Sequence, residues 1–476
     1  MSSGSATQIN GYGTKWTQGL LPVLLVGAGG LLVGVLISVG VGPQKVLYML
    51  ALVAILLAIK WPVQIALGLV ALSLPFDAIL VVWSGAGVTT LTWFISAGAG
   101  ALLLARILTG VRQAPPRVAM WWFLLMAWTA TTSLWALDTR PAVKRLPMAL
   151  SLLIFYLVAV SSRITRKQLN FVVGLAILGG SIAAGWAFWS YLHGMTWEGG
   201  RASLTLDNRE MDPNYFAAML LLPFSLAIGM FLSVRKRIVK LLLALAVGLT
   251  GLSIFLSMSR GALVALISLV SVYGYRLGVR LRTVAVVVVV LALLAAAAPA
   301  SFWERLQPDR MRTGSGRTDI WLAGTQMLKK NLLWGVGIAN FPVAYNSYAG
   351  AGPKFQGYFR DSHNTYLNIM AEEGLIGLAL FFVALVYQFR LRPAVRDSAA
   401  APAAMLVSCQ ATLVGLLAAA FFIDFLYTKV FWFTLMLCTV ISRVNLSPEG
   451  SASEHSNTLS EHSPVDPVFR DTVFTR

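Results

Sequence analysis

The sequence predicts an all-α integral membrane protein that crosses a bilayer about 12–14 times and carries one long loop on its outer side. Two observations lead to this fold class. Apolar residues make up 57% of the 476 residues and charged residues only 12%, whereas soluble domains carry about 25% charged residues. Mean hydropathy is +0.74. A chain so poor in charge cannot cover a water-facing surface, so it belongs in a bilayer.

Apolar stretches follow one another along almost the whole chain, and many reach the roughly 20 residues that a spanning helix needs. Candidate spans lie near 20–41, 46–59, 62–82, 88–108, 118–136, 146–161, 169–192, 215–233, 238–257, 261–279, 283–302, 364–389, 402–422 and 424–442. Two of them, 46–59 and 146–161, are short. No A-x-A-like cleavage site ends the first span, so we interpret it as an uncleaved helix.

Lysine and arginine gather in alternate junctions between these spans, which orients the chain. With a cytoplasmic N-terminus, the inner junctions hold Lys60; Arg106, Arg112 and Arg117; Arg163, Arg166 and Lys167; Arg235, Lys236, Arg237 and Lys240; Arg276, Arg280 and Arg282; and Arg390, Arg392 and Arg396. Two outer junctions depart from the pattern, one with Lys45 and one with Arg140, Lys144 and Arg145. The net charge of +18 therefore reflects the positive-inside rule rather than nucleic-acid binding.

This orientation divides the chain into a cytoplasmic segment (1–18), a membrane domain (19–445) with a periplasmic loop (303–362), and a disordered cytoplasmic tail (446–476). Cys409 and Cys438 fall inside apolar spans, where small core residues are expected rather than a disulfide. Asp77 and Asp424 are isolated carboxylates, and we expect Asp77 near a span end or in a hydrogen bond rather than in catalysis.

The outer loop is expected to contain structure. The pattern of residues 317–330 predicts an amphipathic helix near the membrane surface. Ser362 can cap a helix that begins at His363. Along that helix a polar stripe of Asn364, Asn368 and Glu372 enters the bilayer. Gly374 and Gly377 then permit close helix packing.

Polar residues on the outer side form four clusters, and each also has a structural alternative. Arg201 accompanies Asp212 and Asn214, either of which could simply start a helix. Ser259 and Arg260 form a tight turn without an acidic neighbour, where the arginine could bind an external anion or snorkel toward the interface.

The other two clusters belong to the long loop. Arg317 could bind an anion or pair with Asp319 nearby. Arg360 and His363 stand at the junction with the membrane, where the histidine could act chemically or as a cap or interface residue. His193, in the neighbouring outer loop, is the second candidate base.

The chemistry of these residues fits a lipid-linked diphosphate. The loop carries eight basic and four acidic residues, a net charge of +4. Arginine forks match phosphate oxygens in a bidentate manner, and a neutral histidine can accept a proton from a hydroxyl group. No metal or nucleotide motif is present in the sequence.

Four motifs occur in order, and together they resemble the O-antigen ligase and polymerase superfamily. They are Asp212-Pro213-Asn214-Tyr215-Phe216-Ala217, Ser257-Met258-Ser259-Arg260-Gly261, Ser315-Gly316-Arg317-Thr318-Asp319-Ile320-Trp321, and His363-Asn364-x-Tyr366-Leu367 with Glu373-Gly374-x-x-Gly377. The resemblance covers residues 200–390 by motif and the whole chain by topology. The form of the first motif is also similar to the branch linked to exopolysaccharide or protein glycosylation.

The resemblance implies a GT-C-type glycosyltransferase of the bacterial inner membrane that needs no metal or other cofactor. Such an enzyme takes a glycan from undecaprenyl diphosphate at the periplasmic face and passes it to a hydroxyl of lipid A core, another glycan or a protein. It implies a catalytic His363 and diphosphate binding by Arg260 and Arg317, and we add Arg201 and Arg360 to this group. Supporting roles fall to Asp212, Asn214, Ser259, Asn364 and Glu373.

Two alternatives stay open at this point. A glycan ligase and a glycan polymerase share this chemistry, so the residues do not separate them. The rival from another class is a polysaccharide or lipid-linked glycan flippase, which would be expected to show charged or broken helices near the midplane. Here the polar residues gather on one side, which favours the enzyme.

Overall fold

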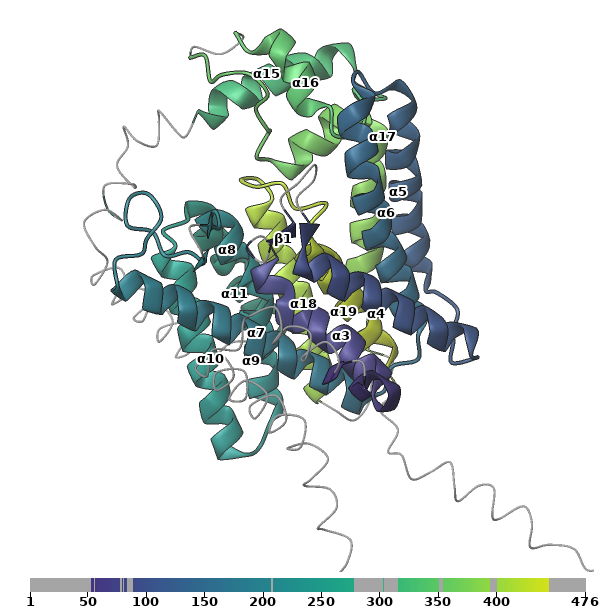
Figure 1. Ribbon diagram of the computed structural model, residues 1–476, viewed down its shortest axis with the longest axis vertical. Coiled ribbons are helices and arrows are strands. Elements are labelled where there is room, and N and C mark those ends of the chain that lie inside the picture. The colour runs from purple at the N-terminus through teal and green to yellow at the C-terminus, as the bar shows by residue number, and fades with distance from the viewer. Residues whose placement is uncertain are drawn as a thin grey trace, which may run out of the picture. The chain divides into compact units, whose positions relative to one another are not determined.

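The computed structural model describes residues 53–54, 56–77, 79, 81–83, 89–206, 209–277, 303, 316–350, 354–393 and 400–444. These residues are helical apart from two short hairpins and the connecting loops (Figure 1). The chain divides after Ile65 into two compact units. The described part of the first unit, up to Ile65, is largely helical, and the second unit holds all the predicted site residues.

The elements follow in chain order. They are α3 (Pro62–Ser73), η1 (Leu74–Phe76), β1 (Val81–Trp83), β2 (Thr89–Thr90), α4 (Leu91–Leu108), α5 (Arg117–Thr132), η2 (Ser133–Trp135), α6 (Thr139–Ser161), α7 (Arg166–Leu192), β3 (Thr205–Leu206), β4 (Arg209–Glu210), α8 (Pro213–Met219), α9 (Leu221–Ser233), α10 (Arg237–Leu256), α11 (Arg260–Leu277), α15 (Arg317–Lys330), α16 (Phe341–Tyr345), η3 (Asn346–Tyr348), α17 (Thr365–Phe389), α18 (Ala400–Ala419) and α19 (Lys429–Arg443). The strands pair as two antiparallel hairpins, β1–β2 and β3–β4.

The helices confirm an all-α, multi-pass membrane protein. Within the described residues, five segments are long and apolar enough to cross a bilayer: α6, α7, α8 with α9, α10, and α17. Shorter apolar helices lie at Pro62–Phe76, Thr92–Leu108 and Ala403–Ala419. The predicted spans 20–41 and 283–302, segment 1–18 and tail 446–476 lie outside the described residues, as does most of 46–59.

The span predicted at 146–161 is longer than expected, because α6 already begins at Thr139. Asp138 caps this helix, and its carboxylate accepts the Arg140 N–H at 2.9 Å. Pro147 lies inside α6 without ending it. The basic residues that we assigned to an outer junction are therefore part of a helix.

Polar contacts between helices hold the buried face of α5 against α17. The Trp122 Nε1 donates to Gln388 Oε1 at 3.1 Å, and the Trp128 Nε1 donates to the backbone oxygen of Glu373 at 2.8 Å. Each satisfies a polar group in a region that offers no water. The two helices therefore run antiparallel with a fixed relative height.

Three other predictions concern single residues in the core. Cys409 and Cys438 are buried free thiols, as expected. Asp77 does not act alone: its carboxylate forms an ion pair with Lys429 Nζ at 2.5 Å, and Thr92 also donates to it. This pair joins the segment after α3 to the start of α19.

The outer loop contains the predicted helix, but the environment of that helix differs from the expectation. The apolar face of α15, with Ile320, Met327 and Leu328, is buried in one cluster with residues of α16 and α17. The face therefore packs on protein rather than on the membrane surface. Gly324 permits this approach, since an added Cβ would lie 2.9 Å from the Leu367 side chain.

Helix α17 is broken at Gly374, which has φ 72° and ψ −172°. The chain that follows α15 crosses at this break. There Val336 N–H donates to the Ala371 oxygen at 2.8 Å, Gly337 N–H to the Glu372 oxygen at 2.9 Å, and Leu375 N–H to the Leu332 oxygen at 2.9 Å. A side chain at position 374 would collide with the Leu333 carbonyl. Glycine is thus required for the crossing rather than for helix–helix packing.

Candidate functional site

His363 lies in the turn before α17 rather than in the helix. The N-cap is Asn364, whose Oδ1 accepts the N–H groups of Tyr366 at 3.0 Å and Leu367 at 3.1 Å. Ser362, which we expected to be the cap, instead exchanges hydrogen bonds with the Asn364 backbone. His363 itself has φ 47°, a left-handed conformation that is uncommon for residues with a side chain. Such conformations are concentrated at functional sites.

The turn is held by elements that lie far apart in the sequence. On one side, the indole N–H of Trp321 in α15 donates to the Ser362 oxygen at 2.9 Å. On the other side, the α18–α19 connector bonds to Thr365, whose hydroxyl donates to the Ile423 oxygen at 2.8 Å and accepts the Phe425 N–H at 2.9 Å. These bonds fix the backbone on both sides of His363.

Arg317 is the first residue of α15 and follows Gly316, which has φ 74°. Its side chain is half-buried, and burial lowers its pKa. The negative charge of Asp212 opposes that shift, whereas the positive charge of Arg260 adds to it. Arg317 does not pair with Asp319, because the Asp319 carboxylate accepts the Gln356 amide at 2.7 Å. Two arginines from separate helices thus act on each other across the site.

Arg260 is the first residue of α11 and is exposed. The turn before it contains Met258 with φ 50°, and the Ser259 hydroxyl accepts the Ala262 N–H at 3.2 Å. Neither Arg260 nor Arg317 forms a hydrogen bond or ion pair with any residue that the structure describes. Their donors are therefore available to an anionic ligand.

Arg201, Asp212 and Asn214 support this turn from the segment before β3 and from the start of α8. The buried Arg201 guanidinium donates to the Ser257 oxygen at 2.8 Å and to Asn214 Oδ1 at 3.0 Å. Asp212 is the N-cap of α8, as the structural alternative predicted, and accepts the Asn214 N–H at 2.7 Å. Arg201 therefore links the backbone before Arg260 to Asn214 at the start of α8.

Charges from several elements converge on His363. Its pKa is lowered, mainly by burial and next by the positive charge of Arg317, while the carboxylates of Asp361 and Asp212 act in the opposite direction. Arg360 adds a smaller lowering. The imidazole is therefore held neutral near pH 7, the form that can accept a proton.

Arg360 occupies the exposed segment that leads to His363. Its Nε donates to the Gln356 oxygen at 2.5 Å. The Phe359 before it has φ 55° and donates its N–H to Asn346 Oδ1 at 2.8 Å. The segment is thus tied to α15 through Gln356 and to η3 through Asn346, and it places a cation beside the histidine.

Two residues at this site were not assigned to it from the sequence: Asp424 was interpreted as an isolated carboxylate, and Arg145 was placed in an outer junction. Asp424, in the α18–α19 connector, accepts the Asn368 amide at 3.4 Å, and its backbone oxygen accepts the Tyr215 hydroxyl at 3.0 Å. Burial raises the pKa of Asp424 to about 6, and the positive charge of Arg145 opposes this shift. Arg145 stacks over the Tyr427 ring at 5.3 Å. The only signal for Arg145 in the sequence was its departure from the positive-inside rule.

Glu372 of the expected polar stripe and Glu373 of the predicted motif both form hydrogen bonds next to the break in α17. The Glu372 carboxylate accepts the N–H groups of Ala339 at 2.8 Å and Phe341 at 2.9 Å. Glu373 Oε1 accepts the Tyr427 hydroxyl at 2.9 Å. Only Asn364 and Asn368 of the expected polar stripe therefore face the histidine turn, while Glu372 secures the chain that leads to α16.

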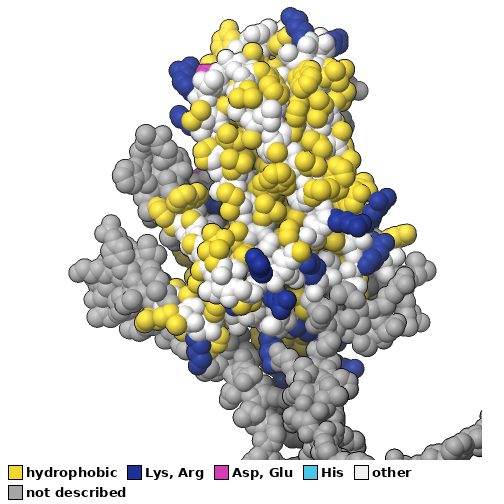
Figure 2. All heavy atoms as spheres, turned by 90° about the vertical axis from the view of Figure 1, so that its right-hand side faces the viewer, with side chains coloured by type: hydrophobic (Ala, Val, Ile, Leu, Met, Phe, Trp, Pro, Cys, Tyr) yellow, Lys and Arg dark blue, Asp and Glu magenta, His cyan; other side chains and the backbone are white. Residues whose placement is uncertain are grey.

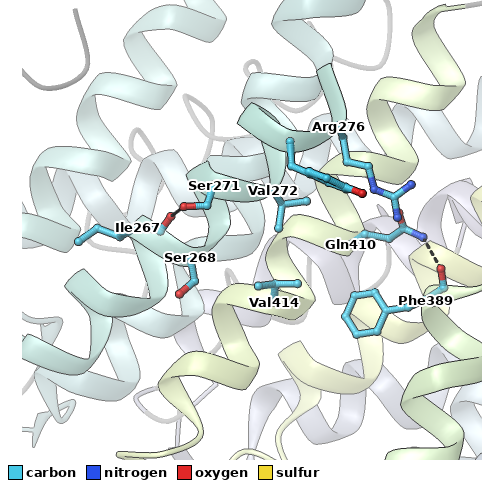
Figure 3. Close-up of a pocket in the computed structure, with 9 residues that line it drawn as sticks. Ile267, Ser268, Ser271, Val272, Arg276, Phe389, Gln410 and Val414 are labelled. Atoms are coloured by element: carbon cyan, nitrogen blue, oxygen red, sulfur yellow. Dashed lines mark hydrogen bonds between the residues drawn. The ribbon is translucent and has the colours of Figure 1, made fainter. Parts of the chain in front are cut away.

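Two other features lie apart from this site. His193 is exposed, stacks on Trp189 with ring centres 4.4 Å apart, and shares its Nδ1 with the Trp189 oxygen at 2.8 Å. A pocket of about 500 Å³ lies between α11, α17 and α18 and is lined by four apolar residues together with Ser268, Ser271, Tyr275, Arg276 and Gln410 (Figure 3). It contains none of the predicted site residues.

A comparison with known families finds a match in the middle of the chain. Residues 245–382 match the family described as O-antigen ligase. The match contains Arg260, Arg317, Arg360 and His363, whereas Arg201, Asp212 and Asn214 precede it. It confirms the resemblance to the O-antigen ligase and polymerase superfamily. No curated protein matches the chain.

Proposed function

We propose that this membrane protein, whose residues 245–382 match the O-antigen ligase family, transfers a glycan from undecaprenyl diphosphate to an acceptor hydroxyl at the periplasmic face of the bacterial inner membrane. The family match supports glycan transfer of the ligase or polymerase type. The observation that carries the proposal is the convergence of Arg260, Arg317 and a neutral His363 from α11, α15 and the turn before α17.

In the proposed reaction a ring nitrogen of His363 accepts the proton of the acceptor hydroxyl. The oxygen forms a bond to the anomeric carbon of the glycan as the bond between that carbon and the diphosphate oxygen breaks. The electron pair of the broken bond stays on the diphosphate. Arg260 and Arg317 bind this leaving group, and Arg360 adds positive charge at the approach. Electrostatic stabilisation of this kind often contributes more to catalysis than any other effect.

The other predicted residues hold this arrangement in place. Arg201 and Asn214 fix the turn before Arg260. Ser259 bonds to the first turn of α11, and Asn364 caps α17. Asp212 contributes negative charge that is felt by both Arg317 and His363. Glu373 acts farther away, at the break in α17. The acceptor could be lipid A core, another glycan or a protein.

The test is transfer by the purified full-length protein in vesicles, with a polyprenyl-diphosphate glycan and candidate acceptors. We expect His363→Ala to lower the rate by about 10²–10⁴-fold, the usual contribution of a positioned base, with carrier binding little changed. His193→Ala is the matched control and should keep full activity. Full activity of a folded His363→Ala protein would remove the proposed base.

A further inference from the structure

A cluster of exposed apolar side chains surrounds three tryptophans at the break in α17. Trp128, Trp135 and Trp334 contact one another with ring centres 5.6–6.0 Å apart. Around them, Leu134 is 83% exposed, Leu137 63%, Leu332 47%, Leu333 53% and Trp334 56%. We call these seven residues the tryptophan patch. Side chains so exposed need a covering partner.

The patch continues a face that is already apolar. On α5, Met120, Phe123 and Leu124 are exposed, and on α17, Phe382 and Val386 are exposed. Figure 2 shows hydrophobic side chains covering this face from its middle to one end, with lysine and arginine side chains at both ends. A patch that continues the lipid-facing side of spanning helices favours lipid as its partner.

The distance from the tryptophan patch to the basic ends of α5 and α17 is close to the thickness of the hydrocarbon core of a bilayer. Eighteen residues lead from Arg117 to Trp135, about 27 Å at the helical rise, and sixteen lead from Gly374 to Arg390, about 24 Å. The hydrocarbon core of a bilayer is about 30 Å thick. Tryptophan is enriched at the two boundaries of this core, and the exposed Lys329 and Lys330 next to the patch suit lipid phosphates.

The patch is also joined to the half of α17 that carries His363. The Leu332 oxygen accepts the Leu375 N–H, and Val336 donates to Ala371 on the other side of the break. Trp128 donates to the Glu373 oxygen. These hydrogen bonds fix the position of the patch relative to the first half of α17, so the depth of the patch in the membrane sets the depth of that half.

We propose that the tryptophan patch is a membrane-surface anchor that lies in the lipid headgroup region and sets the height of the α17 break, and hence of the His363 turn, above the hydrocarbon core. The occupant of the patch is the bilayer itself. This inference concerns the position of the chain in lipid and does not depend on the reaction that His363 performs.

The first experiment measures the surroundings of the patch in the full-length protein in vesicles. A nitroxide is attached at Leu333→Cys, with Thr325→Cys on the exposed face of α15 as the matched control, while the native Cys409 and Cys438 are buried. We expect more frequent collisions with oxygen and fewer with a water-soluble nickel chelate at position 333 than at position 325. Equal accessibility to the nickel chelate would overturn the proposal.

The second experiment tests whether the patch sets the height of the break. A nitroxide at Leu375→Cys reports depth in the bilayer, and Leu333→Asp should shift that depth toward water, because a charge is expelled from the interface. Leu322→Asp, an exposed leucine of α15 outside the patch, should cause no shift. An unchanged depth in Leu333→Asp would contradict the positioning role.

Dipolar coupling between labels at position 333 in dilute vesicles would show that a second copy covers the patch and would also overturn the proposal.

Discussion

His363 is presented by a turn whose backbone is fixed on both sides, so its ring position does not depend on the rotation of a helix. Trp321 holds the Ser362 carbonyl and the α18–α19 connector holds Thr365. A left-handed backbone conformation raises the free energy of the folded state, so it persists only where the surrounding structure fixes it, as these two supports do here. The same feature recurs at Met258, two residues before Arg260. Backbone strain therefore marks both turns that present the central side chains.

The lowered pKa of His363 gives the transfer reaction a defined pH dependence. The neutral base is present above its pKa, which burial and Arg317 hold below the ordinary value of 6.5. We expect the rate to be constant near pH 7 and to fall as the pH drops through a value below 6.5. Removing a positive charge should raise the pKa, so Arg360→Gln should move the midpoint to higher pH. A midpoint that is unchanged in this variant would contradict the electrostatic account.

Arg260 and Arg317, which pair with no residue that the structure describes, should differ from structural arginines in their response to substitution. Arg260→Lys keeps the charge but loses the bidentate fork, and Arg317→Ala loses both. We expect a large loss of transfer in each variant with normal membrane insertion, measured as rate per folded protein. Arg235→Ala, at an exposed inner junction, is the control. Near-normal rates for Arg260→Lys and Arg317→Ala would show that they only snorkel or pair locally.

At the scale of the elements, the apolar pattern predicted the helices well because burial in lipid imposes it over whole spans. Their ends were less predictable. Helix α6 begins seven residues earlier than expected because Asp138 caps it, and α17 begins at Thr365 because Asn364 rather than Ser362 supplies the cap. Caps depend on local hydrogen bonds, which composition does not encode.

The residues of the candidate site also fall into a group that the sequence predicted and a group that it did not. Arg260, Arg317 and His363 stood out because they are polar residues beside long apolar runs. Asp424 and Arg145 did not, because their meeting depends on the α18–α19 connector and α6 reaching the same place in the fold. No periodicity in the sequence reports such a tertiary contact.

The break in α17 should be intolerant of any side chain at Gly374. Gly374→Ala places a Cβ against the Leu333 carbonyl and forces alanine into a backbone conformation, φ 72° and ψ −172°, that costs a residue with a side chain about 1–3 kcal/mol by itself. We expect a lower melting temperature in detergent and reduced transfer. Gly248→Ala in α10 is the matched control, because its added Cβ meets nothing within 4 Å. Equal melting temperatures for the two variants would contradict the crossing described here.

At the scale of the whole molecule, the central prediction concerns the side of the membrane on which the site lies. The distribution of basic junctions predicts that α15 and α16 lie outside. Ser347→Cys, in the exposed part of η3, should react with an impermeant reagent in intact cells. Arg235→Cys, at an inner junction, should react only after permeabilisation. The reverse result would reject the orientation and with it a periplasmic reaction.

The ion pair between Asp77 and Lys429 has a consequence for biogenesis. Its two residues are 352 positions apart, so during synthesis the carboxylate emerges from the ribosome long before its ammonium partner. Until α19 is inserted, the nascent chain must carry Asp77 without this charge, and an uncompensated carboxylate in a membrane domain is costly. A chain that ends after α18 would retain every predicted site residue and yet lack Lys429, the partner of Asp77. Quality-control proteases should therefore remove such a truncated chain faster than the full-length protein.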